Sequence, residues 1–450
     1  MWVEKLTLEN IKCFENCEIV LGTPKKCFKW VTFLGENGGG KSTALQALAL
    51  LLAGPENVRP LFNLPNSWLK DEYRAGKIGV TLHKGAQDPG KWGGEARETK
   101  TFNYHYWMTG TQRLEIQGTD YNEPTILEPK ENRHLSWLRS NALLPRSLGW
   151  FSAGYGAFRR LTRKGGQIIV PKLQTPLRYT NFLTQFEEDE PLSAFENWLV
   201  FLKFRILMNG ENGKKARKQY DLGIQVIDAL LPQGNKFEKI DENGQIWFDM
   251  NGVSSPTIAL SDGYRSILAL SGDLVWRLIE AFPDSDAPLK EEGVVLIDEL
   301  DIHLHPSWQR QIANRLQTIF PNLQFIVATH SPLIAAGAGK DAKTYRFFKD
   351  ANGNIQTETI ENIAFKEVDQ ILQGKAFGLV STFSIEAEET MQAYLKLKDK
   401  PHKSPTEKKI FEQLSLNAQE MLKPQTGDLS ETDAALRQEM IDYIKKNIIL

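Results

Sequence analysis

The stretch FLGENGGGKSTALQALALLL, residues 33–52, places four glycines, a lysine and two hydroxyl side chains between two apolar segments. Upstream, residues 30–34 (WVTFL) have the β-branched and aromatic composition of a buried strand. Downstream, Leu45, Leu48 and Leu52 recur at helical spacing and predict an amphipathic helix. We therefore expect a strand, a glycine-rich loop and a helix in direct succession.

This loop has the composition of a polyphosphate-binding site. The glycines allow a tight turn that aims successive N–H groups into a concave nest at a helix N-terminus. The spacing GxxxxGK[ST] is that of a P-loop, in which Lys41 reaches the β- and γ-phosphates and the Ser42 hydroxyl binds Mg²⁺. The alternative is a glycine-rich turn beside a chance Lys-Ser pair. The expected ATP-binding residues are Gly35, Glu36, Asn37, Gly38, Gly39, Gly40, Lys41, Ser42 and Thr43.

Two adjacent carboxylates follow a second apolar run, in EEGVVLIDELDIHLHP (residues 291–306). The four apolar residues before them predict a central parallel strand that is buried on both faces. The carboxyl end of such a strand is where α/β proteins form ligand sites. We expect Asp298 to hold Mg²⁺ and Glu299 to act as the general base on the attacking water.

Two further segments contain polar residues beside apolar elements. LSDGYRSIL, residues 260–268, precedes a strongly apolar helix, which we expect Ser261 to cap while Gly263 allows close approach of an anion. Alone, this is also an ordinary capping sequence. LQFIVATHSPLI, residues 323–334, predicts another buried strand, which ends near His330.

In this order and spacing, the motifs resemble those of the ABC ATPase superfamily. LSDGYRS resembles the LSGGQ-type signature, and His330 resembles the switch histidine that contacts the γ-phosphate. LTLENIKCFEN, residues 6–16, resembles the opening strands of RecF-, SMC- and OLD-type ATPases. The resemblance implies a homodimer or higher even oligomer. In it, ATP lies between the P-loop of one subunit and Ser261, Asp262 and Gly263 of another.

The sequence also departs from the superfamily pattern. GYRS replaces GGQ, and no clear Q-loop glutamine is found; its place is taken by WFSAGYGAFRRLTRK, residues 150–164. GYGAFRR resembles a segment of OLD-like and phage-defence ATPases, which implies that Arg159 or Arg160 approaches phosphate or signals to the lid. The alternative is the basic, solvated start of a helix. His303 and His305 allow a metal interpretation, but they lie where ABC ATPases place the D-loop.

The expected fold class is α/β, a P-loop ABC-type ATPase core over residues 1–365 with a mostly parallel central sheet. Residues 55–150 predict an antiparallel β lobe. Residues 180–250 predict a short helical lid, and the lack of sustained heptads excludes a long coiled-coil arm. Residues 366–450 predict a helical C-terminal region. In its last helix, Ser430 and Asp433 are a candidate capping pair; the apolar face, for the core or a partner subunit, comprises Leu436, Met440, Tyr443, Ile444 and Ile448.

Amino-acid composition and net charge limit the class of protein and its expected location. The chain has 450 residues, of which 24% are charged and 41% hydrophobic, as in globular proteins. The net charge of −2 provides no global attraction to nucleic acid. No apolar run approaches the ~20 residues that span a bilayer, and the N-terminus is charged where a signal peptide is apolar. We therefore expect a cytoplasmic protein without a membrane partner. Three cysteines lack the fourth ligand of a zinc site and are expected in the first strands: Cys13, Cys17 and Cys27.

The compact lid, GYGAFRR and the tail resemble the ATPase subunit of Septu-type and related retron anti-phage systems. The resemblance implies an ATP hydrolase with Mg²⁺ that acts as a nucleotide-gated clamp on a separate HNH-type nuclease. No D-x-D metal motif follows His330, so we expect no nuclease centre in this chain. The alternative is a RecF-like DNA repair ATPase that binds DNA directly. A transporter subunit lacks support, since no Q-loop is found.

Overall fold

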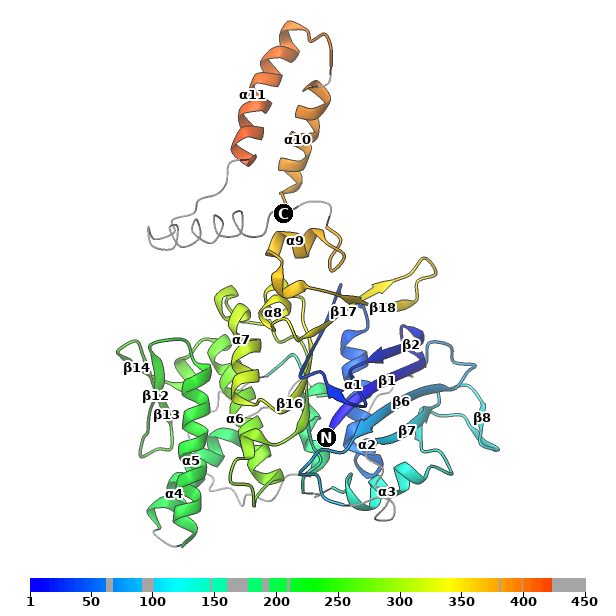
Figure 1. Cartoon of the computed structure of the whole chain (residues 1–450), viewed down its shortest axis with the longest axis vertical. Coiled ribbons are helices and arrows are strands. Elements are labelled where there is room, and N and C mark those ends of the chain that lie inside the picture. The colour runs from blue at the N-terminus through cyan, green and yellow to red at the C-terminus, as the bar shows by residue number, and fades with distance from the viewer. Residues whose placement is uncertain are drawn as a thin grey trace. The chain divides into compact units, whose positions relative to one another are not determined.

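The chain forms two compact units, Met1–Gly378 and Leu379–Leu450, which are described separately. The computed structural model (Figure 1) describes residues 1–61, 68–90, 101–145, 148–159, 177–187, 194–208, 211–379, 382–398 and 400–422. The expectations for Arg160 and for the capping pair and apolar face of the last helix lie outside these ranges. Within them, no helix is both long and apolar enough to cross a bilayer.

A six-stranded sheet forms the centre of the first unit, in the order β11-β15-β16-β5-β17-β18. Its first five strands are parallel, and only β18 is antiparallel to its neighbour. The expectation of a mostly parallel central sheet is therefore confirmed. The strands are β11 (Phe151–Tyr155), β15 (Gly293–Ile297), β16 (Leu323–Ala328), β5 (Trp30–Gly35), β17 (Lys343–Lys349) and β18 (Ile355–Ile360).

A second sheet, fully antiparallel, has the order β10-β7-β6-β1-β2. Three of its strands come from the predicted β lobe, and the N-terminal hairpin of β1 and β2 completes it. Its strands are β1 (Trp2–Ile11), β2 (Phe14–Val20), β6 (Gly76–His83), β7 (Thr101–Met108) and β10 (Ile126–Leu127). Two small ribbons accompany it, β3 (Gly22–Thr23) with β4 (Lys26–Cys27) and β8 (Leu114–Ile116) with β9 (Thr119–Tyr121).

The P-loop helix α1 (Lys41–Ala53) lies between the two sheets. It packs against β6 of the antiparallel sheet and against four strands of the parallel sheet. Ten of its 13 residues are buried, including every residue from Ala47 to Ala53. The expectation of an amphipathic helix is wrong, because a helix enclosed from both sides has no solvent-facing stripe.

The parallel sheet separates two apolar cores. Along β15, Val294 and Leu296 point into a core shared with α1 and the antiparallel sheet. Val295 and Ile297 alternate with them and point into a second core, shared with the helices on the other face. This burial on both faces explains the uninterrupted apolar run of the strand.

Helices cover the second face of the parallel sheet, as the green elements of Figure 1 show. The range predicted as the lid contributes two of them and two strands of a three-stranded antiparallel sheet, whose third strand follows directly after that range. The elements are α4 (Ala194–Leu207), α5 (Glu211–Leu230), β12 (Asn235–Ile240), β13 (Ile246–Met250), β14 (Val253–Pro256), α6 (Asp262–Ala281) and α7 (Pro306–Ile319). Further α-helices in the described part of this unit are α2 (Pro55–Leu61), α3 (Arg133–Asn141), α8 (Pro332–Gly337) and α9 (Val368–Gln373).

The second unit is a helical hairpin in its described part, formed by α10 (Ile385–Lys398) and α11 (Pro405–Leu422). The rings of Tyr394 and Phe411 stack between them with centroids 5.4 Å apart. None of the side chains described in α10 and α11 is buried. The described part of this pair of helices therefore has no apolar core.

Candidate nucleotide-binding site

Four neighbouring parallel strands end at one edge of the central sheet, in the order β11-β15-β16-β5. Asp298 and Glu299 follow β15, His330 lies two residues beyond β16, and the P-loop follows β5. Arg159 lies four residues beyond β11. Because parallel strands share the direction of their carboxyl ends, the predicted catalytic groups are brought together at this edge.

Glycines of the P-loop are required by close backbone approaches. Gly40 is the N-cap of α1, with a φ of 86°, and a Cβ there would lie 2.6 Å from Cζ of Phe14 and 2.8 Å from Sγ of Cys13. A Cβ on Gly35 would lie 2.5 Å from the carbonyl oxygen of Phe347. No larger side chain fits at either position without moving its neighbours.

The lysine of the motif is bound within the loop. Its side chain is buried, and Nζ donates to the carbonyl oxygens of Gly35 at 2.8 Å and Glu36 at 2.9 Å. Burial lowers the pKa of Lys41, while the charges of Asp298 and Glu299 act in the opposite direction. The carboxylates after β15 thus help to keep an ammonium group charged at the start of α1.

Asp298 and Ser42 together suit a divalent cation. Burial raises the pKa of Asp298, and a hydrogen bond from Ser42 opposes this shift. The Oδ1 atom of Asp298 is buried without a hydrogen-bond partner among the described residues. An unpartnered buried carboxylate oxygen is costly unless it meets a cation, and carboxylate and hydroxyl oxygens are ligands that Mg²⁺ accepts. These two residues fit the predicted Mg²⁺ site.

Glu299 has an unusual backbone conformation. Its φ is +46°, in the left-handed region that residues other than glycine seldom adopt. Such conformations persist where surrounding contacts enforce them, and they are concentrated at functional sites. The carbonyl oxygen of Glu299 accepts hydrogen bonds from the Arg159 side chain and from the N–H of Ile302.

Asp301, which was not among the predicted site residues, holds the segment that contains His330. Its Oδ1 accepts a bond from the N–H of His330 at 3.2 Å and another from the Thr329 hydroxyl. The pKa of His330 is lowered by burial and by the charge of Lys41, and Asp301 and Glu299 oppose that shift. The imidazole is therefore favoured in its neutral form. The only sequence signal for this contact was the position of Asp301, an acidic residue two positions after Glu299.

The signature segment begins helix α6, as expected, but without the expected cap. Ser261 occupies the N-cap position, and its side chain makes no capping hydrogen bond. Ser261 and Asp262 are exposed, whereas Gly263 is buried. A Cβ on Gly263 would lie 2.4 Å from the carbonyl oxygen of His303. The glycine is thus required for contact with the D-loop segment of the same chain.

Arg159 is neither solvated nor free to approach a phosphate, so the solvated helix start and the phosphate contact are both wrong for this residue, while signalling to the lid stays a prediction. Its side chain is 4% exposed. All three guanidinium nitrogens bind atoms of the protein: the carbonyl oxygens of Gly156, Asp298 and Glu299 and the hydroxyl of Ser266. Three of these partners are distant in the sequence: Ser266 lies 107 residues from Arg159, Asp298 lies 139 residues away and Glu299 lies 140 residues away. No local sequence pattern could therefore have revealed them.

A glutamine also lies near this edge of the sheet, although sequence reasoning found none. Gln185 is 8% exposed, and neither polar atom of its side chain has a partner among the described residues. Its carbonyl oxygen accepts a bond from Gln46 of α1. A Cβ on Gly154, in β11, would lie 2.3 Å from its Oε1. Gln185 therefore lies between the P-loop helix and the strand beside β15.

The histidines and cysteines that were considered as ligands of other metals do not form a metal site in the described residues. Nδ1 of His305 accepts from the N–H of Ser307 at the start of α7. Cys17 lies in β2 and Cys27 in β4, while Cys13 lies in the turn after β1. Across the described ranges, no group of three or more histidine, cysteine or acidic side chains is placed to hold a metal ion.

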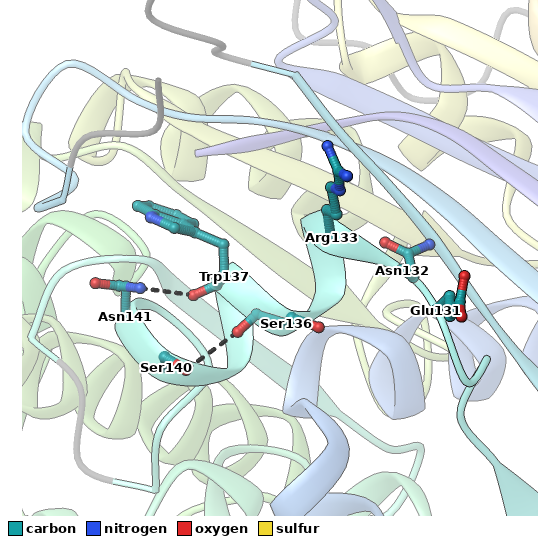
Figure 2. Close-up of a pocket in the computed structure, with 7 residues that line it drawn as sticks. All are labelled: Glu131, Asn132, Arg133, Ser136, Trp137, Ser140 and Asn141. Carbon is teal, nitrogen blue, oxygen red and sulfur yellow. Dashed lines mark hydrogen bonds between the residues drawn. The ribbon is translucent and has the colours of Figure 1, made fainter. Parts of the chain in front are cut away.

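A shallow recess lies on α3, apart from these motifs (Figure 2). Its volume is about 680 Å³, and the hydrogen bonds drawn there, from Asn141 to the carbonyl of Trp137 and from Ser140 to that of Ser136, are internal to the helix. The lining residues are Glu131, Asn132, Arg133, Ser136, Trp137, Ser140 and Asn141. None of the predicted site residues contributes to it.

Comparison with known proteins agrees with this arrangement. The family model described as "AAA domain, putative AbiEii toxin, Type IV TA system" matches residues 31–336, which begin in the strand before the P-loop and end in the helix after His330. The chain belongs to this family. The four motifs found in the sequence all lie inside the matched region, so this AAA domain is the ABC-type ATPase core that they indicated.

Named relatives of this AAA-family chain include two groups of proteins. The chain is 28% identical over 409 residues to the Septu protein PtuA of Bacillus mycoides, a match that covers 90% of this chain and 48% of that protein. It is 42% identical over 122 residues to the "Retron Ec83 probable ATPase" of Escherichia coli, covering 26% of this chain and 22% of that one. The chain thus spans about half the length, or less, of these two relatives.

Among solved structures, the chain is similar to an SMC head bound to the C-terminal winged-helix domain of ScpA, at 16% identity and a TM-score of 0.49. The similarity covers 81% of this chain and all of that one.

Proposed function

We propose that this protein binds and hydrolyses ATP between two subunits and that the resulting opening and closing controls a partner nuclease. One observation carries the proposal: the buried, unpartnered Oδ1 of Asp298 lies among Ser42, Lys41 and Glu299 at the carboxyl edge of the parallel sheet. A carboxylate with one oxygen left unpartnered among the described residues, next to a P-loop lysine and a hydroxyl, suits a nucleotide whose phosphates are accompanied by a divalent cation.

Each residue has a distinct task in this scheme. Lys41 would exchange its bonds to the loop carbonyls for bonds to the β- and γ-phosphates. Ser42 and Asp298 would hold Mg²⁺, which neutralises charge on the phosphate oxygens when bound. Glu299 would accept a proton from the attacking water, and neutral His330 would contact the γ-phosphate.

The exposed start of α6 supports a site that needs two chains. Ser261 and Asp262 are exposed at the N-terminus of a 20-residue helix, and the Ser261 hydroxyl is not used in capping it. N–H groups at such an end favour an anion. We infer that they meet the γ-phosphate on the P-loop of a second subunit, in a homodimer or a higher even oligomer.

Similarity to Septu and retron proteins supports the biological part of the proposal. Those relatives support a role in anti-phage defence. As the partner that the ATPase gates, we propose the HNH-type nuclease that the resemblance of the motifs implies. In this scheme, closure on ATP and opening after hydrolysis are the two states that the partner distinguishes. The negligible net charge of the chain, −2, favours a protein partner over direct capture of DNA.

Two substitutions test the enzymatic part. Lys41→Ala is expected to remove ATP binding in calorimetry, whereas Lys29→Ala, at the other end of β5 and bonded to the Asn322 carbonyl, should bind normally. Glu299→Gln should bind ATP, fail to hydrolyse it and accumulate as a closed dimer in light scattering. Normal turnover in Glu299→Gln would remove the general base from the scheme.

The regulatory part needs the neighbouring gene product. Co-expression with an HNH-type protein encoded beside this chain should yield a complex whose cleavage of DNA differs between wild type and Glu299→Gln. Identical cleavage by both complexes, in the presence and absence of ATP, would argue against gating while leaving the ATPase assignment intact.

A further inference from the structure

We propose that Arg159 is a positioning residue for hydrolysis, one that fixes the backbone of Glu299 and joins it to the signature helix α6. The inference deepens the proposed ATPase function and rests on it. It starts from the almost complete enclosure of the Arg159 side chain, which is 4% exposed.

The guanidinium group holds the turn after β15 at two consecutive residues. Nη1 donates to the carbonyl oxygen of Asp298 at 2.6 Å, and Nη2 donates to that of Glu299 at 3.0 Å. The second bond falls on the residue whose φ is +46°. The carbonyls of Asp298 and Glu299 belong to the two peptide planes that flank the Glu299 Cα, so the two bonds together hold its left-handed conformation and with it the direction of its side chain.

The same group also reaches α6. Nε donates to the hydroxyl of Ser266 at 3.3 Å, and Ser266 lies on the first turns of that helix, beyond Ser261 and Gly263. Nη1 also donates to the carbonyl oxygen of Gly156, the first residue after β11, so the arginine side chain is anchored to its own segment as well. A displacement of α6 is thus transmitted through one rigid, planar group to the general base.

Arginine is suited to this task because its fork presents donors in fixed directions. The four acceptors around Arg159 belong to three separate segments, and a lysine ammonium on a flexible stem would not reach all of them in one geometry. Burial lowers the pKa of Arg159 to about 10, and nearby Asp298, Asp301 and Glu299 oppose that shift, so the group stays charged at neutral pH.

Gly156 shows how the arginine is directed inward. A Cβ there would lie 1.8 Å from the carbonyl oxygen of Thr184, and its N–H donates to the Thr184 hydroxyl at 3.2 Å. Directly after β11, the chain therefore packs closely against Thr184. Three residues later, the side chain of Arg159 contacts the turn after β15. The GYGAFR segment thus serves to deliver one buried guanidinium group.

The test is a double-mutant cycle between Arg159 and Glu299. Arg159→Lys keeps the charge but not the fork, and we expect it to lower kcat at least tenfold while leaving the ATP dissociation constant within threefold of wild type. In a Glu299→Gln background, the same change should leave the residual hydrolysis unaltered, because the group that it positions is already gone. A merely structural role would lower both rates by the same factor.

Two further variants complete the design. Arg178→Lys is the matched control, since Arg178 is equally buried and bonds the carbonyl oxygens of Leu52 and Trp150, away from the turn after β15. It should lower Tm without lowering kcat of the folded enzyme. Ser266→Ala removes the bond to α6 alone and should lower kcat about threefold or more.

The possible results distinguish a failure of the proposed ATPase function from a failure of the positioning role of Arg159. A wild-type enzyme without ATP turnover would refute the proposed function. With an active wild type, an unchanged kcat in Arg159→Lys, or equal losses in both backgrounds, would overturn the positioning role. An unchanged kcat in Ser266→Ala would overturn the link to α6.

Discussion

The carbonyl oxygen of His303 lies 2.4 Å from the point where a Cβ on Gly263 would stand. The signature helix and the D-loop segment of one chain therefore meet through a glycine. His303 has a φ of +64°, so its own backbone is constrained as well. Any change at this contact alters two of the segments that we assign to the subunit interface.

Gly263→Ala should consequently disturb both segments. Because the added methyl meets a backbone oxygen rather than a flexible side chain, the D-loop must shift to accommodate it. We expect ATP turnover to fall at least tenfold and Tm to fall by several degrees. Steady-state hydrolysis and a thermal melt measure the two effects. Unchanged values in both assays would show that the loop yields without consequence.

Ser261→Ala should separate capping from ligand contact. A serine that caps a helix through its side chain typically contributes about 1 kcal/mol, and Ser261 makes no such bond. The free energy of unfolding should therefore stay within about 0.5 kcal/mol of wild type, while ATP-driven dimer formation weakens. Ser331→Ala is the comparison, since the Ser331 hydroxyl does cap α8, at 3.2 Å from the N–H of Ile334. Chemical denaturation and light scattering provide the measurements.

Asp298→Asn should raise stability in buffer without Mg²⁺. The folded-state pKa of Asp298 is raised by burial, so the folded protein loses stability as pH rises from the unfolded value, about 3.9, through the folded one. At neutral pH the amide avoids this loss, and Tm should increase by about 1–2 °C, the size expected for ~1 kcal/mol in a large domain. The gain should disappear near pH 3–4.

With Mg²⁺ and ATP present, the order should reverse, because only the wild type gains stability by binding the cation. Thermal melts at several pH values, with and without the cation, test both statements. A Tm of Asp298→Asn below that of wild type in metal-free buffer at neutral pH would contradict them.

A chain that ends at Gly378 should fold and hydrolyse ATP. The apolar cores of the first unit contain no residue beyond position 378, and α10 in the second unit has no buried residue. We expect Tm to change by less than about 2 °C, and kcat to stay within twofold. Aggregation of this shortened chain, while the full chain stays monodisperse, would show that the second unit covers apolar surface of the first.

Much of the site could be predicted from the sequence because its residues follow buried strands. The strand before Asp298 is an uninterrupted apolar run, and the strands before Lys41 and His330 are apolar except for Thr32 and Gln324. Such runs mark a parallel sheet whose ligand groups lie at one edge. Motif order then assigned their roles. The mostly parallel sheet and the antiparallel lobe followed from the same patterns and are confirmed.

The parts that sequence reasoning missed depend on contacts between distant segments. Arg159 follows a strand as a surface arginine would, and its buried position is set by carbonyl oxygens 139 and 140 residues away. The missing cap at Ser261 depends on a side-chain rotation that no residue pattern encodes. The helix α1 was expected to be amphipathic because Leu45, Leu48 and Leu52 recur at helical spacing; enclosure by a second sheet buries the other faces of its later turns as well.

That enclosure has a consequence for sequence drift. In most surface helices, positions that tolerate substitution alternate with positions that do not, because only one face is buried. In α1, every residue from Ala47 to Ala53 is buried. Each of these side chains fills space set by the distance between two sheets, so both larger and smaller replacements are costly. A saturation scan of α1 should therefore show a continuous intolerant block rather than a periodic one, and compensating changes should arise in strands of both sheets.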